Sequence, residues 1–359
     1  MKLSDVIESL VEERGLSEEV LGSIICEGML AAYQKRYPYL NIKVSLNKKS
    51  KELVVEVEKQ VVGAVHDDEI EISTRKAKTI QPTVEEGQSL WMPFEGVVGR
   101  IEIMRAKQVI ASRIKEIEAS AVFDEFIGKQ GHILQGMVHK IERGGVVVKI
   151  QDYLAFLPKS LSIPDEKLIV GHPVRALLKE VLAEPRNENQ LILDRACPEF
   201  VEQLFRIEIP EVFERLVDIK KIVRIAGYKT KVAVVSNDPN IDPVGTCVGV
   251  GGVRIKPILK ELGVEKVDII EWTDSLDTLV KMSLKPAEIN RVELSDDNRL
   301  ARVWLDDEQR SLAIGKMGQN VALASRLAGV AIELVSNEST AGSLEKEFEE
   351  RDSQESGNE

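Results

Sequence analysis

The stretch AIGKMGQNVALASRLAG, residues 313–329, places the tetrad Gly315-Lys316-Met317-Gly318 between two segments with the apolar spacing of helices. A second tetrad, Gly249-Val250-Gly251-Gly252, lies 66 residues earlier in the same context. Two β-rich runs precede each tetrad, and a helix and a third β-rich run follow it. The expected strands are 221–226, 230–235 and 267–270 around the first tetrad, and 291–294, 301–305 and 331–334 around the second. The sequence therefore predicts a tandem duplication of an αββααβ module.

A GxxG tetrad between two helices is suited to holding a phosphate. Glycine at both ends permits backbone angles and a close approach that a side chain would forbid. The helix that follows offers unpaired N–H groups and the positive end of its dipole to an anion. Beside a sheet edge, such a loop grips the backbone of about four nucleotides, which is the KH arrangement. Two copies in matched context are much more specific than one, so we expect two tandem KH domains.

The two tetrads differ in charge. Lys316 supplies a cation within the second loop, whereas Arg254 and Lys256 must supply it from just downstream of the first. Residues 219–237 carry five cations and no acid, a run that is either a solvated face or, beside a GxxG loop, a phosphate track. The RNA-binding candidates from these patterns are Gly249, Val250, Gly251, Gly252, Arg254, Lys256, Gly315, Lys316, Met317, Gly318, Gln319, Asn320, Lys221 and Arg224.

The remainder of the chain is expected to form two further domains. Residues 130–195 hold five short β-rich runs, with a long excursion between the third and fourth, which is typical of a small OB-type barrel. Before it we expect a short helix around Ile7, a longer one that starts after Ser17 and stops before Pro38, paired strands and a connector helix over 103–127. The expected strands there are 42–46 and 53–57, joined by a turn at 48–51, with a third at 70–72.

These patterns predict an α+β multidomain chain. The expected boundaries are 1–127 for a mixed α/β N-terminal domain with its long connector helix, 128–198 for the five-stranded OB-type β-barrel, 199–273 and 274–340 for the two αββααβ KH domains, and 341–359 for an acidic disordered tail. That tail carries two basic and seven acidic residues, so it accounts for almost half of the net charge of −12.

Composition excludes several classes of protein. The 359 residues are 43% hydrophobic and 30% charged, enough for ordinary cores, and the net charge excludes a uniformly basic nucleic-acid coat. The three cysteines make no CxxC pair, and no long apolar segment is present, so we expect a soluble cytoplasmic chain without a membrane anchor. The four histidines are scattered. We therefore expect no catalytic site, no metal and no cofactor.

Three segments carry a resemblance to a known family. They are LFRIEIPE (204–211), NDPNIDPVGTCVG (237–249) and the stretch 313–329, with weaker support from YQKRYP (33–38) and GRIEIMRAKQVI (99–110). On these segments the sequence resembles the NusA family of bacterial transcription elongation, termination and antitermination factors. The resemblance covers nearly the whole chain in the order N-terminal domain, OB-type domain, KH, KH.

The resemblance implies a function that the residues alone do not. It implies an N-terminal domain that binds RNA polymerase, a barrel and KH pair that bind nascent single-stranded RNA, and cooperation with other Nus antitermination factors, with the chain acting as a monomer. The family's loop glycines correspond to Gly249, Gly252, Gly315 and Gly318, and its basic residues correspond to Arg254 and Arg195. Gly251 stands where the family commonly has a basic residue. Lys35 and Arg36 are candidates for contacting polymerase or an RNA hairpin.

Two alternatives remain open at this stage. One is an exoribonuclease, since barrel and KH modules accompany phosphorolytic nucleases, although residues 1–125 offer neither the length of a catalytic domain nor a carboxylate cluster for a metal. The other is a general RNA chaperone or ribosome-associated protein, which would bind RNA without binding polymerase.

Overall fold

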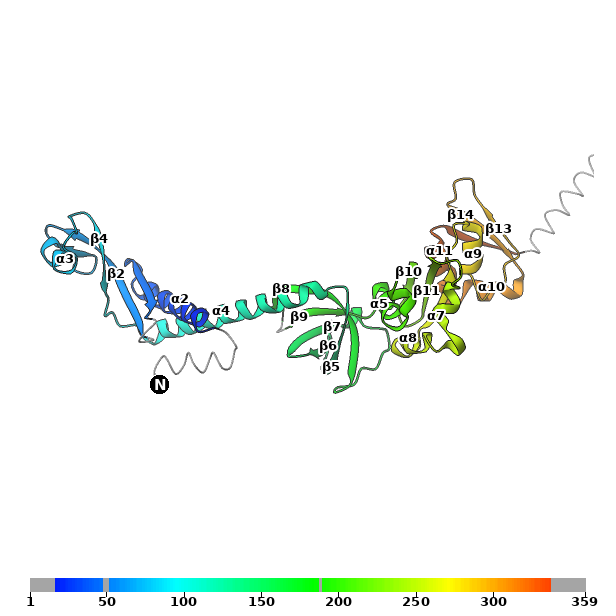
Figure 1. Ribbon diagram of the computed structural model, residues 1–359, viewed down its shortest axis with the longest axis horizontal. Helices are drawn as coiled ribbons and strands as arrows, with labels where there is room; N and C mark the ends of the chain where they lie inside the picture. Colours follow the sequence, from blue (N-terminus) through cyan, green and yellow to red (C-terminus); the bar gives the residue numbers. More distant parts are fainter. Residues whose placement is uncertain (1–16, 48–51, 187–188, 337–359) are drawn as a thin grey trace, which may run out of the picture. The chain divides into compact units, whose positions relative to one another are not determined.

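The computed structural model describes residues 17–47, 52–186 and 189–336, and the chain divides into two compact units, residues 1–122 and 123–359 (Figure 1). The expected α+β multidomain fold is confirmed: an N-terminal α/β unit, a closed five-stranded barrel and two αββααβ modules. The helix expected around Ile7, the turn at 48–51 and the acidic tail lie outside the described residues. The exact domain boundaries remain predictions.

The first unit is built on two packed helices. Helix α2 (Glu18–Arg36) begins after Ser17, whose hydroxyl oxygen accepts a hydrogen bond from the Val20 N–H at 3.4 Å, as an N-cap does. Leu21 and Ile24 of α2 pack against Ile114 of the long helix α4 (Arg100–Phe126). The two helices come close at Gly28, where an added Cβ would lie 2.4 Å from Ile110. The expected connector helix is therefore present, and its N-terminal half is part of the core of this unit.

A four-stranded sheet completes the first unit. Strand β2 pairs antiparallel with β1 and β4 and parallel with β3. Strand β4 and helix α3 were not predicted from the sequence. Helix α3 buries only Ala77, and β4 is five residues long and ends in a proline. The elements are β1 (Ile42–Leu46), β2 (Leu53–Val62), β3 (Glu71–Ser73), α3 (Thr74–Ile80) and β4 (Ser89–Pro93).

The second unit begins with the expected barrel. Its strands close in the order β5-β6-β7-β9-β8, with only the β7–β9 pair parallel. Strand β6 is buried along almost its whole length, since Val146, Val147 and Val148 are all in the core. The strands are β5 (Ile133–Glu142), β6 (Gly145–Ile150), β7 (Tyr153–Pro158), β8 (Pro173–Arg186) and β9 (Asn189–Asp194), with short 3₁₀ turns η1 (Ile127–Lys129) and η2 (Lys159–Leu161).

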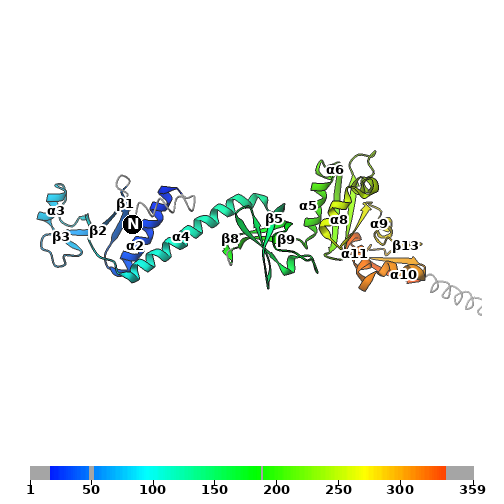
Figure 2. The same cartoon turned by 90° about the horizontal axis from the view of Figure 1, so that it is seen from below.

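The first αββααβ module has helices on one face of a three-stranded sheet. Strand β11 is central, antiparallel to β10 and parallel to β12. Helices α5 and α8 lie beside each other (Figure 2) and share a core with Val232 and Val234 of β11. The elements are α5 (Pro198–Glu208), α6 (Pro210–Phe213), β10 (Val217–Ile225), β11 (Lys229–Ser236), α7 (Pro243–Val248), η3 (Val250–Gly252), α8 (Ile255–Leu262) and β12 (Lys266–Glu271).

The second module repeats this order and covers the other face of the first sheet. Leu323 and Leu327 of α11 pack on Val223, Ala233 and Ile270 of the first module. Because side chains alternate along a strand, Ala233 faces α11 while its neighbours face α5 and α8. The elements are α9 (Leu276–Ser283), β13 (Arg291–Leu294), β14 (Leu300–Leu305), α10 (Asp307–Ile314), η4 (Lys316–Gly318), α11 (Gln319–Ala328) and β15 (Ala331–Ser336).

Candidate nucleic-acid interface

The two glycine loops have nearly the same backbone conformation. In the first, Gly249, Gly251 and Gly252 have φ of 73°, 62° and 75°. In the second, Gly315, Met317 and Gly318 have φ of 70°, 52° and 74°. The third tetrad position is thus left-handed in both loops, and in the second loop a methionine adopts it. The duplication predicted from the sequence extends to the individual backbone angles.

The first glycine of each loop is required by close packing as well as by its angles. A Cβ on Gly315 would lie 2.7 Å from Cβ of Asn320, and one on Gly249 would lie 2.9 Å from Cγ of Arg254. A Cβ on Gly318 would meet nothing within 4 Å. The first glycine therefore lets the loop fold back onto the next helix, whereas the space outside Gly318 is open to a ligand.

The second loop presents a cation next to the start of a ten-residue helix. Lys316 is exposed, and within the part of the chain that the structure describes it has no ion-pair partner. Gly318 is the N-cap residue of α11, so the positive end of that helix lies beside the loop. Met317 is 87% exposed. The arrangement offers a cation, helix N–H groups and an open surface, which is the chemistry that a phosphate needs.

Asn320, which was predicted to bind RNA, has a buried side chain with a scaffolding role. It is 2% exposed, and its amide Nδ2 donates to the carbonyls of Leu284, Leu312 and Ala313, each at 3.2 Å. These bonds tie the start of α11 to the ends of α9 and α10. Gln319 beside it is half-buried.

The first loop lacks a free cation of its own. The Arg254 guanidinium donates from Nη1 to Glu211 and to the Thr246 carbonyl, both at 2.9 Å, and is only partly exposed. Lys256 is exposed on α8 beside Gly252. Val250 is 96% exposed at the tip. The first loop therefore offers backbone groups and a more distant lysine, with its arginine engaged by protein.

Arg195 lies inside the junction between the barrel and the first module, which contradicts its predicted place on an RNA surface. It is 2% exposed, and its guanidinium pairs with Glu166 and with Glu261, the latter at 2.6 Å from Nη1. Arg175 pairs with the same Glu261 at 2.9 Å and with Glu208 at 3.0 Å. Burial acts to raise the pKa of Glu261, but the two arginines outweigh it and lower that pKa. The five side chains form the junction cluster, which fastens β8 and the residue that follows β9 to α5 and α8.

The predicted phosphate track over 219–237 is also largely internal. Arg224 and Glu265 form a fully buried bidentate pair, with both N···O distances at 2.9 Å. Lys229 and Lys231 both pair with Asp268 at 2.9 Å. Burial lowers the pKa of the Lys231 ammonium. The acids lie more than thirty residues along the chain from these cations, so no local sequence signal showed that the charges would be paired.

The other predicted residues are dispersed. Lys221 is half-buried near Gly329, at the end of α11, while Lys35 and Arg36 are exposed in the last turn of α2 in the first unit.

Burial raises the pKa of both Cys197 and Cys247 to about 12, so these thiols stay protonated near neutral pH.

Two features are absent from the described residues. No group of three or more His, Cys, Asp or Glu side chains in them is placed to hold a metal ion. Across the same residues, no helix has both the length and the apolar character needed to span a membrane.

An OB-type barrel followed by two interlocked KH modules defines a class of tandem-KH proteins. Family models match three segments, described as NusA N-terminal domain (residues 2–120), NusA-like first KH domain (195–272) and NusA-like second KH domain (276–341). The chain belongs to the NusA family.

Curated relatives match almost end to end. The transcription termination/antitermination protein NusA of Bacillus subtilis (strain 168) is 32% identical over 355 residues, covering 98% of this chain and 95% of the relative. The protein of the same name from Thermus thermophilus is 35% identical over 340 residues, covering 90% and 87%. The solution structure of the N-terminal domain of NusA from B. subtilis is 31% identical, with a TM-score of 0.25, and covers 32% of this chain and 95% of that one.

Proposed function

We propose that the protein is a non-catalytic transcription factor that binds RNA polymerase and nascent single-stranded RNA to regulate pausing, termination and antitermination. Membership in the NusA family supports this function at the level of the whole chain. The observation that carries the RNA part is the second glycine loop, where exposed Lys316 stands beside the start of α11.

The second loop is the principal phosphate contact in this proposal. Lys316 supplies the charge, the first turn of α11 supplies N–H donors, and Asn320 holds the start of that helix in place. The open space outside Gly318 receives the phosphate. The first loop adds backbone donors and Lys256, while Arg254 fixes the loop conformation through Glu211 and Thr246.

The N-terminal domain acts as the polymerase anchor. Lys35 and Arg36 are exposed at the end of α2 and would contact polymerase or an RNA hairpin. Anchoring raises the local concentration of protein at the emerging transcript to roughly millimolar for a short connection. Weak contacts at the loops then suffice, which agrees with an RNA interface on an acidic chain. We further propose that the chain is a cytoplasmic monomer that works with other Nus antitermination factors.

The dwell time of bacterial RNA polymerase at a hairpin pause tests the proposal. We expect the full chain to lengthen the dwell, and a chain lacking residues 1–127 to lose the effect while retaining RNA binding. A full chain that binds single-stranded RNA but leaves the dwell unchanged, with the cognate polymerase, would instead support a general RNA-binding protein. Nucleotides released from labelled RNA would contradict the non-catalytic assignment.

A further inference from the structure

A groove of about 1060 Å³ lies between the start of barrel strand β5 and the first module, away from the two glycine loops. It is lined by His132 from the barrel, by the C-terminal half of α5, by α6 and by the first residues of β10. We call it the junction groove. None of the RNA-binding candidates named individually from the sequence lines it, although Lys220 belongs to the basic run 219–237.

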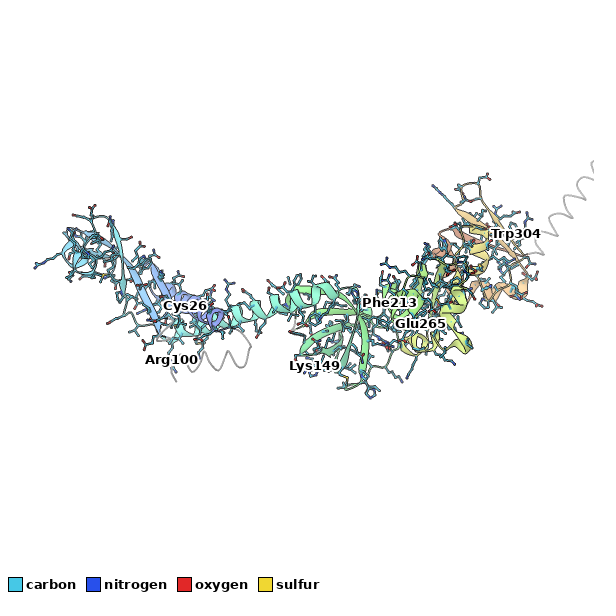
Figure 3. The ribbon with its side chains drawn as sticks, in the orientation of Figure 1. Cys26, Arg100, Lys149, Phe213, Glu265 and Trp304 are labelled. Carbon is cyan, nitrogen blue, oxygen red and sulfur yellow. The ribbon has the colours of Figure 1, made fainter. Side chains whose placement is uncertain are left out.

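The junction groove contains an aromatic side chain that the protein does not bury. Helix α6 directs Val212 into the core of the first module, while the next residue, Phe213, is 75% exposed (Figure 3). Ile207, on the same wall, is 56% exposed. An exposed aromatic ring beside a polar groove is suited to stacking on an unpaired base.

The charges of the junction groove favour an anion. Arg215 and Lys220 are exposed, and in the described part of the chain neither has an ion-pair partner. The two acids of the groove are already engaged: Glu202 pairs with Arg206 at 2.8 Å, and Asp218 accepts a hydrogen bond from the Asn237 amide at 2.9 Å. The exposed ring is thus accompanied by two cations, and the only acid of the groove lining that is not paired with a cation is Asp218, so positive charge is in excess.

We propose that the junction groove is an additional binding site for single-stranded RNA, in which a base stacks on Phe213 and the flanking phosphates contact Arg215 and Lys220. The junction-groove site rests on the proposed RNA-binding function, and it would contact a segment of the transcript outside the two KH loops. A flat ring flanked by cations matches a nucleotide, which carries a π-face and a phosphate together. An acidic peptide would satisfy the cations but has no general need of an exposed ring.

Two variants of the full chain separate the base contact from the phosphate contact. Phe213→Ala should weaken binding of a labelled single-stranded oligoribonucleotide of mixed sequence by about 5- to 150-fold, the range for loss of one stacked base. Arg215→Ala/Lys220→Ala should lower the slope of log affinity against log salt by about 1.4, or 0.7 for each phosphate contact on a single strand. With an abasic oligonucleotide, Phe213→Ala should have no effect and the double charge variant should keep its effect.

Matched controls test whether these effects are local. Met137→Ala removes another exposed apolar side chain from β5, and Lys76→Ala/Lys78→Ala removes two exposed cations from the first unit. Both controls should bind the oligoribonucleotide as the parent does. A third variant, Phe213→Trp, reports occupancy directly, because the indole fluorescence in excess of the parent's should be quenched when a base stacks on it.

The outcomes distinguish this proposal from the general one. Binding by the parent, with Phe213→Ala unchanged and Phe213→Trp unquenched, would overturn the junction-groove site and leave the proposed function intact. Absence of RNA binding by the parent would overturn both. Quenching of Phe213→Trp by an acidic, phenylalanine-containing peptide and not by RNA would show that the groove takes a peptide, and would overturn the RNA assignment.

Discussion

The two glycine loops share a backbone and differ in what they do with their cations. In the first, the nearby arginine is turned inward to Glu211 and Thr246, and the tip carries Val250. In the second, Lys316 is exposed and an asparagine amide, not an arginine, braces the next helix. The two copies have the same loop backbone, but the cation near the first loop is held by protein groups whereas the cation of the second loop is exposed. A conserved loop geometry therefore does not imply an equal share of binding, and the side chain that stabilises the loop must be distinguished from the one that meets the ligand.

The largest difference should come from the first glycine of each loop. Gly315→Ala adds a Cβ 2.7 Å from Asn320 and forces a residue with a side chain to φ 70° and ψ 178°, a region almost confined to glycine. We expect the second module to lose about 2–4 kcal/mol of local stability and RNA binding to fall with it. Amide hydrogen exchange of α11 measures this loss.

Gly249→Ala is the partner of that experiment. Its backbone strain is similar, but the nearest atom it meets is Cγ of Arg254 at 2.9 Å, a longer contact than the one at Gly315. We expect a loss of about 1–3 kcal/mol, seen in the exchange of α8. Equal losses in both modules would contradict the expectation that the shorter contact, at Gly315, is the more costly one.

The next effect is electrostatic and leaves the fold intact. Gly318→Asp places a carboxylate in the open space where the proposed phosphate lies, at a left-handed position that aspartate tolerates. RNA affinity should fall about tenfold in filter-binding titrations, while the unfolding temperature changes little. Gly318→Asn is the control, with the same shape and no charge. If both variants bind RNA as the parent does, the second loop is not the phosphate site.

Replacing Lys316 or Arg254 with alanine should change different properties, RNA binding in the first case and stability in the second. Lys316→Ala should reduce the salt slope of RNA binding by about 0.7 and leave stability unchanged, because Lys316 is exposed. Arg254→Ala should leave the slope unchanged and destabilise the first module by about 1 kcal/mol, because it removes hydrogen bonds to a partly buried carboxylate and a carbonyl. A lowered slope for Arg254→Ala would show that its guanidinium leaves Glu211 to bind RNA.

The smallest effect concerns the left-handed third position. Met317→Gly relieves a methionine held at φ 52° and should stabilise the second module by about 1 kcal/mol. Gly251→Ala should cost the first module a similar amount, with no steric contribution because nothing lies within 4 Å. Local hydrogen exchange compares the two. A methionine whose removal destabilises its loop would show that its side chain supports the fold.

The predictable parts of this molecule were those governed by local patterns. Strand 291–294 has the expected bounds, and β12 (Lys266–Glu271) extends the expected run by one residue at each end. Ser17 caps α2 as its position before an apolar helical pattern indicated. The duplicated GxxG context located both loops correctly in the fold. The alternation of side chains along a strand and the capping of a helix depend on residues that are neighbours in sequence, so both could be predicted from the sequence.

The fate of individual charges was not predictable, because it depends on partners distant in sequence. Arg224 looked like part of a basic surface, but it pairs with Glu265, the residue before β12, forty-one residues along the chain. Arg195 and Asn320 were likewise expected at a surface and are 2% exposed. The exposure of Phe213 also depends on packing, and no local pattern in the sequence indicated it. Only the packing of Val212 inward leaves its neighbour outside.

The junction cluster restricts how pieces of this chain can be exchanged with those of relatives. A barrel transplanted without arginines at positions 175 and 195 would leave Glu261 and Glu208 facing it without their counter-charges, and removing one partner of a buried pair costs roughly 3–5 kcal/mol. Dividing the chain between residues 198 and 199 therefore breaks the ion-pair network of the junction cluster and does not cleanly separate the barrel from the first KH module. Recombination that retains function must carry the barrel and the first KH module together, as one heritable piece.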